Sequence, residues 1–419
     1  MSQVPSGPLR RELGTFDAVM IGLGSMLGAG IFAALAPAAQ SAGSALLLGL
    51  ALAAVIAFCN ATSSARLAAV YPASGGTYVY GRMRLGEFWG YLAGWGFVVG
   101  KTASCAAMAL TVGFYAWPAH AHAVAVGAVV ALTAINYAGV QKSAWLTRVI
   151  VAIVLSVLAA VVVTAIGSEG IDVTTLDITD VSITGVLQAA GLLFFAFAGY
   201  ARIATLGEEV RDPARTIPRA IPIALAITLV VYSVVAVATL TTLGPLRLAA
   251  SAAPLLDTVS VAGVRWMEPV VRIGAIVAAT GSLLALILGV SRTTFAMARD
   301  RHLPHALAAV HPRYGVPYRA EILVGLVVST LAATADLRGA IGFSSFAVLV
   351  YYAVANASAW TLSPAEGRPP RIVPALGLIG CVVIALALPL SSVLTGTAVL
   401  AVGILIYVAR RLSAPGTRE

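Results

Sequence analysis

Glycines interrupt two apolar stretches of the sequence where a helix would otherwise be continuous. The first stretch reads I-G-L-G-S-M-L-G-A-G-I-F and has glycine at positions 22, 24, 28 and 30. The sixth reads F-F-A-F-A-G-Y-A-R, with Gly199 in mid-stretch. Because glycine in a helix costs about 1 kcal/mol relative to alanine, these positions predict breaks in both helices. Close helix packing is the alternative, since Gly24 and Gly28 have the GxxxG spacing.

Two broken helices facing each other could bind a zwitterion. Unwinding frees backbone N–H groups that can hold a carboxylate, aided by the positive end of the half-helix dipole. The freed carbonyl oxygens of the partner break can accept hydrogen bonds from an ammonium. The breaks fall in the first helix of each five-helix half, where inverted-repeat transporters form their central site. The pattern therefore predicts a receptor that needs no charged side chain within the bilayer.

Lys101 lies near the middle of the third apolar stretch, in G-W-G-F-V-V-G-K-T-A-S-C. A lysine at that depth costs about 2.5–3.5 kcal/mol on insertion scales, so we expect it to face the protein interior. One hypothesis makes it a proton-coupling or substrate-contacting group. The other makes it a structural charge that the carbonyl groups of a helix end satisfy.

The elements that must position these residues are membrane-spanning helices. The 419 residues are 60% hydrophobic and only 10% charged, which excludes a soluble enzyme, a nucleic-acid-binding domain, a disordered chain and a disulfide-stapled secreted domain. A bilayer-spanning helix needs about 20 apolar residues. We predict an all-α integral membrane protein with twelve transmembrane helices, at residues 16–39, 44–70, 87–117, 121–139, 144–167, 183–205, 217–243, 269–298, 320–335, 339–361, 372–389 and 392–410.

Basic residues orient these spans. If the N-terminus is cytoplasmic, 21 of the 26 lysines and arginines lie on the cytoplasmic side, and only Arg247, Arg265, Arg272 and Arg338 lie outside. The net charge of +9 is therefore a topology signal and not a sign of nucleic-acid binding. The first span is too long for a signal peptide, so we expect it to be retained. We predict a multi-pass protein of the plasma (inner) membrane with both termini cytoplasmic.

Four motifs in order resemble the amino acid–polyamine–organocation (APC) superfamily, in its prokaryotic-type amino acid permeases. They are G-S-M-L-G-A-G-I-F, Y-P-A-S-G-G-T-Y-V-Y-G-R, F-F-A-F-A-G-Y followed by G-E-E-V-R-D-P-A-R-T-I-P-R-A-I, and S-R-T-T-F-A-M-A-R-D-R-H-L-P. The resemblance implies a secondary active transporter of amino acids or related amines, with a five-plus-five inverted repeat, broken helices 1 and 6, and two trailing helices. The expected division is a tail at 1–15, repeats at 16–167 and 183–361, trailing helices at 372–410 and a tail at 411–419.

The resemblance also implies a substrate site. Carried over by motif, the N–H groups of Gly28, Ala29 and Gly30 would bind the substrate carboxylate. Carbonyl groups near Met26, Phe195 and Ala198, in the break that contains Gly199, would bind the ammonium. Phe195 stands where the family often has an aromatic lid, although ordinary packing is the alternative for at least one phenylalanine of that run.

Two positions depart from the family pattern and affect coupling. Many members have glutamate where this chain has Ala201, which Arg202 follows, and some proton-coupled members have lysine where it has Val154. By motif spacing Lys101 falls where the third helix lines the cavity, so Lys101 and Arg202 become coupling candidates.

An inner gate is conceivable after the sixth span. Glu208 or Glu209 could pair there with arginines of the segment E-E-V-R-D-P-A-R. A solvated turn that fixes the entry to span seven is the alternative.

We predict a transporter of amino acids, neutral ones in particular, because no acidic residue is expected deep in a span to receive a second ammonium. Lys101 and Arg202 leave an acidic side chain as an alternative. Protons are the expected coupling ion and sodium is less expected. An amine exchanger or exporter and a non-transporting sensor are the alternatives. The motifs of an enzyme, a cofactor or a metal site are not found, and Cys59, Cys105 and Cys381 fall within spans. Lipid and substrate are the partners we expect; no nucleic acid or obligatory protein partner is implied.

Overall fold

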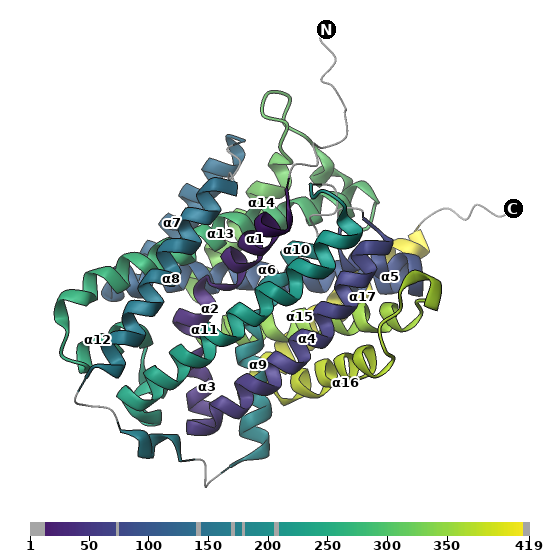
Figure 1. Cartoon of the computed structure of the whole chain (residues 1–419). Coiled ribbons are helices and arrows are strands. Elements are labelled where there is room, and N and C mark those ends of the chain that lie inside the picture. The colour runs from purple at the N-terminus through teal and green to yellow at the C-terminus, as the bar shows by residue number, and fades with distance from the viewer. Residues whose placement is uncertain are drawn as a thin grey trace, which may run out of the picture.

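The chain folds as a bundle of helices (Figure 1). The computed structural model describes residues 13–72, 75–139, 144–168, 172–177, 181–204 and 209–413. The α-helices within them are α1 (Thr15–Met26), α2 (Ala29–Ala33), α3 (Leu35–Ala42), α4 (Leu46–Val70), α5 (Thr77–Leu85), α6 (Glu87–Ala116), α7 (Ala121–Tyr137), α8 (Ala144–Ile166), α9 (Ile183–Phe197), α10 (Ala201–Ala204), α11 (Pro213–Ala250), α12 (Pro254–Val261), α13 (Glu268–Arg299), α14 (Tyr318–Thr334), α15 (Leu337–Trp360), α16 (Ile372–Ala387) and α17 (Leu390–Ser413). The prediction of an all-α fold is confirmed for these residues.

Ten helical segments of the described chain are long and apolar enough to cross a membrane, and they overlap ten of the predicted spans. The other two predictions, 320–335 and 372–389, correspond to α14 with 17 residues and α16 with 16. Both are shorter than the roughly 20 residues that a crossing usually takes. Twelve crossings and the inverted repeat therefore stay predictions.

Helix α11 is longer than the predicted span 217–243 at both ends. Pro213 begins the helix, where its missing N–H has no helical partner, and Pro218 and Pro222 lie further inside. Near its far end Gly244 has φ +69°, a left-handed conformation that glycine adopts without a steric penalty, and the helix kinks before Pro245.

The two predicted interruptions are present. In the first span α1 ends at Met26, Gly28 has ψ −140°, and α2 starts at Ala29. In the sixth span α9 ends at Phe197 and gives way to η4, a 3-10 turn at Ala198–Tyr200. Backbone groups at both places are therefore released from regular α-helical pairing.

The glycines bring these interruptions into direct contact. A β-carbon on Gly199 would lie 2.4 Å from the carbonyl oxygen of Ser25, and one on Gly30 would lie 2.6 Å from the Cα of Ala196. A β-carbon on Gly28 would come within 2.2 Å of Ser282 Oγ. Both interpretations of the glycines thus apply, since the helices break and also pack too closely for a side chain.

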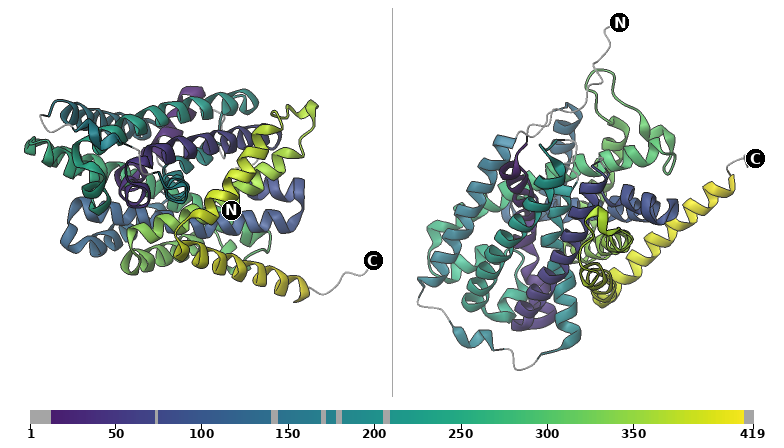
Figure 2. Two further views of the ribbon diagram at one scale, coloured as in Figure 1. Left: turned by 90° about the horizontal axis from the view of Figure 1, so that it is seen from below. Right: turned by 45° about the vertical axis from the view of Figure 1, so that its right-hand side comes forward.

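Helix α6 runs through the interior and packs against α13 and α15. The side chains on its face towards α15 are small, and the hydroxyl groups of Ser104 and Ser344 lie 2.6 Å apart there. Helix α17 lies along one edge of the bundle in both views of Figure 2. Because α6 is central and packs closely against its neighbours, its Lys101 can reach the broken helices.

The ends of the bundle can be told apart by their contacts. At one end, which we call the proximal end, Leu13 before α1 pairs with Glu209 and Arg211 through its backbone. The ring of Tyr407, near the end of α17, meets that of Phe88, at the start of α6, edge to face. The beginning of α1 and the end of α17 therefore lie at the same end, opposite the distal end where α3 and α12 meet the turn after α11 (Figure 1).

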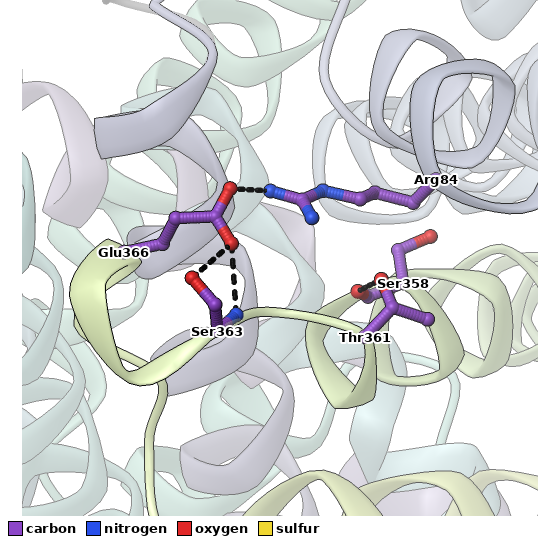
Figure 3. Close-up of polar contacts among 5 residues, drawn as sticks. All are labelled: Arg84, Ser358, Thr361, Ser363 and Glu366. Atoms are coloured by element: carbon purple, nitrogen blue, oxygen red, sulfur yellow. Dashed lines mark hydrogen bonds and ion pairs between the residues drawn. The ribbon is translucent and has the colours of Figure 1, made fainter.

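A polar contact anchors α5 at the proximal end (Figure 3). Arg84 donates to a carboxylate oxygen of Glu366, and the other oxygen accepts from the backbone N–H and the hydroxyl of Ser363, both at 2.8 Å. These hydrogen bonds, those of Arg84 first, lower the pKa of Glu366 from its ordinary value of 4.5 to about 2. Helix α5 is thereby joined to the segment between α15 and α16.

Candidate functional site

A cavity of about 160 Å³ extends from the two helix breaks towards the proximal end. Its wall at the breaks includes Ser25, Ala198, Gly199 and Ser282. Its full lining is Ser25, Gly75, Tyr78, Phe97, Lys101, Ala198, Gly199, Arg202, Glu209, Ser282, Ala285, Leu286, Gly289, Arg292, Thr293, Ala296 and Tyr351. Residues from segments far apart in the sequence thus meet around one space.

Lys101 joins the middle of α6 to the broken sixth span. Its Nζ donates to the carbonyl oxygen of Ala198 at 3.3 Å, and the side chain is 7% exposed. The hydroxyl of Tyr352 donates to the same oxygen at 3.4 Å. The break thus provides an acceptor that an intact α9 would have used internally, and a cation occupies it.

The first break is held by a residue of α11. The Tyr232 hydroxyl lies 2.5 Å from the carbonyl oxygen of Met26 and 3.1 Å from that of Ala196. One phenol therefore connects the two broken spans on the distal side of the cavity. Met26 itself is 1% exposed, so its carbonyl faces Tyr232 and not the open space.

Further contacts occupy the distal end. The Tyr115 hydroxyl donates to the carbonyl oxygen of Phe32 at 3.0 Å, and the two rings meet edge to face. Arg338 donates to the side-chain oxygen of Gln40 and to the carbonyl oxygen of Ala249. The first contact joins α6 to α2, and those of Arg338 join α15 to α3 and α11 at the distal end, while the cavity extends towards the proximal end.

The residues predicted to bind substrate are divided by the structure. Ala198 and Gly199 line the cavity. Gly28, Ala29 and Gly30 are buried against α9 and α13, and Phe195 is buried in the core. The carboxylate-binding and ammonium-binding roles stay predictions.

The proposed coupling and gate residues lie nearer the mouth. Arg202 and Glu209 line the cavity and interact electrostatically, and Arg292 of α13 lies within range of Arg202. Glu208 lies outside the described residues. Val154 is buried on α8, and Ala201 begins α10.

A polar cluster connects the cavity wall to the segment after α13. The Tyr78 hydroxyl, on α5, lies 2.7 Å from Asp300 Oδ2 and 2.8 Å from His302 Nδ1, and Arg82 donates to the same Asp300 oxygen at 2.8 Å. Burial raises the pKa of Tyr78 above its ordinary range and lowers that of His302 below 6.5. Burial therefore disfavours the charged imidazolium of His302 in the folded protein.

Sequence reasoning did not single out several residues of this region. Tyr232, Tyr352 and Ser282 contact the breaks from helices far along the chain, so no local spacing signals them. Glu321 on α14 is fully buried, and neither carboxylate oxygen has a hydrogen-bond partner within the described residues. Glu321 lies at the beginning of the predicted span 320–335, next to proline and polar residues, so the sequence did not indicate that its side chain is buried.

Comparisons with known proteins agree with this architecture. The family described as amino acid permease matches residues 13–410. The chain is 75% identical to a protein named uncharacterized transporter from Mycobacterium tuberculosis, over 98% of this chain and 94% of that one. It is 25% identical to the branched-chain amino acid permease of Bacillus subtilis, over 95% of this chain and 92% of that one.

A human protein named cationic amino acid transporter 4 is 29% identical over 86% of this chain and 61% of its own length. The family match covers nearly the whole chain, and these relatives are named for transport and not for catalysis. The chain therefore belongs to the amino acid permease family, within the amino acid–polyamine–organocation superfamily.

Proposed function

We propose that the protein is a secondary active transporter that takes up amino acids across the plasma membrane by alternating access. The observation that carries the proposal is the cavity at the meeting of two helix breaks, with contacts closing its distal side. The proximal end would be cytoplasmic, as the distribution of basic residues predicts. A cavity that extends towards the cytoplasmic end and is closed on the distal side corresponds to an inward-facing state of the transporter.

We assign protons as the coupling ion, with Lys101 as the group that carries them. The support is its position, because the ammonium lies in the cavity wall and bonds to the carbonyl oxygen of Ala198. Loss of the proton would release that oxygen to another donor. Proton release and substrate contact would thereby be linked at one atom.

The substrate class follows from the charges around the cavity. Among the described residues the lining has three basic side chains, Lys101, Arg202 and Arg292, and one acidic side chain, Glu209. This excess of positive charge disfavours a substrate with a cationic side chain. The relatives' names point to branched-chain and to cationic amino acids, so they support amino acids without choosing the side chain. Neutral amino acids bring no further cation among these charges, so we propose them as substrates.

Counterflow in proteoliposomes tests this function. The purified full chain would be reconstituted, loaded with unlabelled leucine, glutamine, glutamate or arginine, and supplied with the same labelled compound outside. Neutral amino acids should exchange, and an inward proton gradient should drive their accumulation while a sodium gradient should not. Exchange of arginine alone would contradict the substrate assignment.

The two alternative functions predict different results in these assays. An exchanger or exporter would show counterflow but no accumulation under an inward proton gradient. A sensor with this fold would be stabilised by substrate in a thermal-shift assay and would show no counterflow.

A further inference from the structure

The ammonium of Lys101 has binding capacity that the described residues leave unused. Of its three N–H donors, one bonds to Ala198, at the long distance of 3.3 Å. Within the described residues no carboxylate lies within ion-pair distance of it. A nearly buried cation that has two donors unused among the described residues is stabilised by an anion that reaches it.

The surroundings of Lys101 favour such an anion. Arg202 and Arg292 line the same cavity, and Glu209 interacts with Arg202. Glu321 interacts electrostatically with Arg292 but does not line the cavity. The described lining therefore has more cations than anions, and walls of low dielectric strengthen the field.

Polar and aromatic groups complete the wall around the ammonium. Ser25 and Ser282 lie at the breaks, and the tilted rings of Phe97 and Tyr351 contact each other with their centres 5.3 Å apart. None of these four groups carries a negative charge that would compete with a ligand for Lys101. A carboxylate on a ligand side chain would be the natural counter-ion.

We propose that Lys101 is a specificity-determining residue that makes the cavity prefer an acidic amino acid to the neutral amide of the same shape. The preference is for glutamate over glutamine and for aspartate over asparagine. It rests on the proposed function, since it assumes that this cavity is the substrate site. Neutral amino acids remain substrates, and the acidic side chain adds an ion pair with Lys101.

Competition between matched ligands tests the proposal. Counterflow of whichever labelled neutral amino acid exchanges fastest would be inhibited by unlabelled glutamate or glutamine, in wild type and in Lys101→Gln, Lys101→Arg and Arg313→Gln. In wild type glutamate should inhibit about tenfold more strongly than glutamine, as a charged hydrogen bond implies. Lys101→Gln should abolish that ratio and Lys101→Arg should retain it. Arg313 is exposed outside the cavity, so its substitution should leave the ratio unchanged.

The outcomes separate the two proposals. Equal inhibition by glutamate and glutamine in wild type, or an unchanged ratio in Lys101→Gln, overturns the role of Lys101 while neutral counterflow keeps the transport function. No counterflow and no substrate-induced thermal shift with any amino acid of the panel would remove both. Because the readout is a ratio within each variant, a change in reconstituted amount does not affect it.

Discussion

Gly199 lies against Ser25 so closely that a β-carbon would come within 2.4 Å of the Ser25 carbonyl oxygen. The two interrupted spans therefore touch through backbone alone, at the wall of the cavity. The contact explains why glycine stands in the middle of the sixth span. It also explains why the cavity reaches both breaks at once.

Gly199→Ala should weaken the protein because the added methyl group must push the breaks apart. Overpacking of this kind costs about 1–3 kcal/mol. The thermal midpoint of the purified protein in detergent should fall, and counterflow should fall with it. Gly127→Ala is the matched control, since a β-carbon at Gly127 in α7 meets nothing within 4 Å. A Gly199→Ala protein as stable and active as Gly127→Ala would contradict the close contact.

Tyr232→Phe should loosen the distal closure by removing the hydroxyl that bridges Met26 and Ala196. A lost hydrogen bond of this kind is worth about 1 kcal/mol. The three native cysteines are buried, so an Ala36→Cys reporter, at the wall of a distal hollow, can be read by thiol labelling. Labelling should become faster in Tyr232→Phe and stay the same in Tyr314→Phe, which alters an exposed ring. Equal labelling in both would mean that Tyr232 does not hold the closure.

Glu366 should contribute stability that is lost in acid. Its folded pKa of about 2 lies below the ordinary 4.5 because Arg84 and Ser363 bond to the carboxylate (Figure 3). A depressed carboxyl pKa stabilises the fold above pH 4.5, and this contribution disappears as the pH falls towards 2. The difference in thermal midpoint between wild type and Glu366→Gln should therefore shrink over that interval. A difference that is constant with pH would contradict the contact.

His302 should make the proximal cluster sensitive to mild acid. Burial lowers its pKa below 6.5, so the neutral ring next to Tyr78 is stabilising above 6.5 and this contribution is lost as the pH falls through the folded pKa. Thermal midpoints measured from pH 7.5 downwards should fall less in His302→Gln than in wild type. His120→Gln, at an exposed histidine beyond α6, is the control and should behave as wild type. A wild-type acid response in His302→Gln would exclude this histidine as its source.

Local sequence features predicted the breaks and the interior lysine because each has a local cost. Glycine in a helix and lysine in a bilayer are unfavourable wherever they occur, so Gly28, Gly199 and Lys101 could be recognised without their partners. The partners could not be predicted in the same way. Tyr232 and Tyr352 are ordinary aromatic residues of apolar helices, and only the packing of α11 and α15 brings their hydroxyl groups to the breaks.

The surroundings of Gly28 to Gly30 likewise could not be predicted from the local sequence. A glycine cluster predicts a break and a tight contact equally well, and only tertiary structure shows that α9 and α13 fill the space beside it. Helix ends are also hard to predict from sequence, since α14 begins two residues before its predicted span and α16 ends two residues before the end of its own. The ends of such helices depend on proline and loop geometry as well as on hydropathy.

Proton-driven uptake in Lys101→Ala proteoliposomes tests the coupling role of the cavity most directly. The measurement is the initial rate of labelled neutral amino acid uptake at a series of external pH values, with and without an inward proton gradient. Wild type should accumulate label under the gradient, and Lys101→Ala should lose most of the rate and all of its pH dependence. Uptake by Lys101→Ala at the wild-type rate with unchanged pH dependence would contradict the role of Lys101.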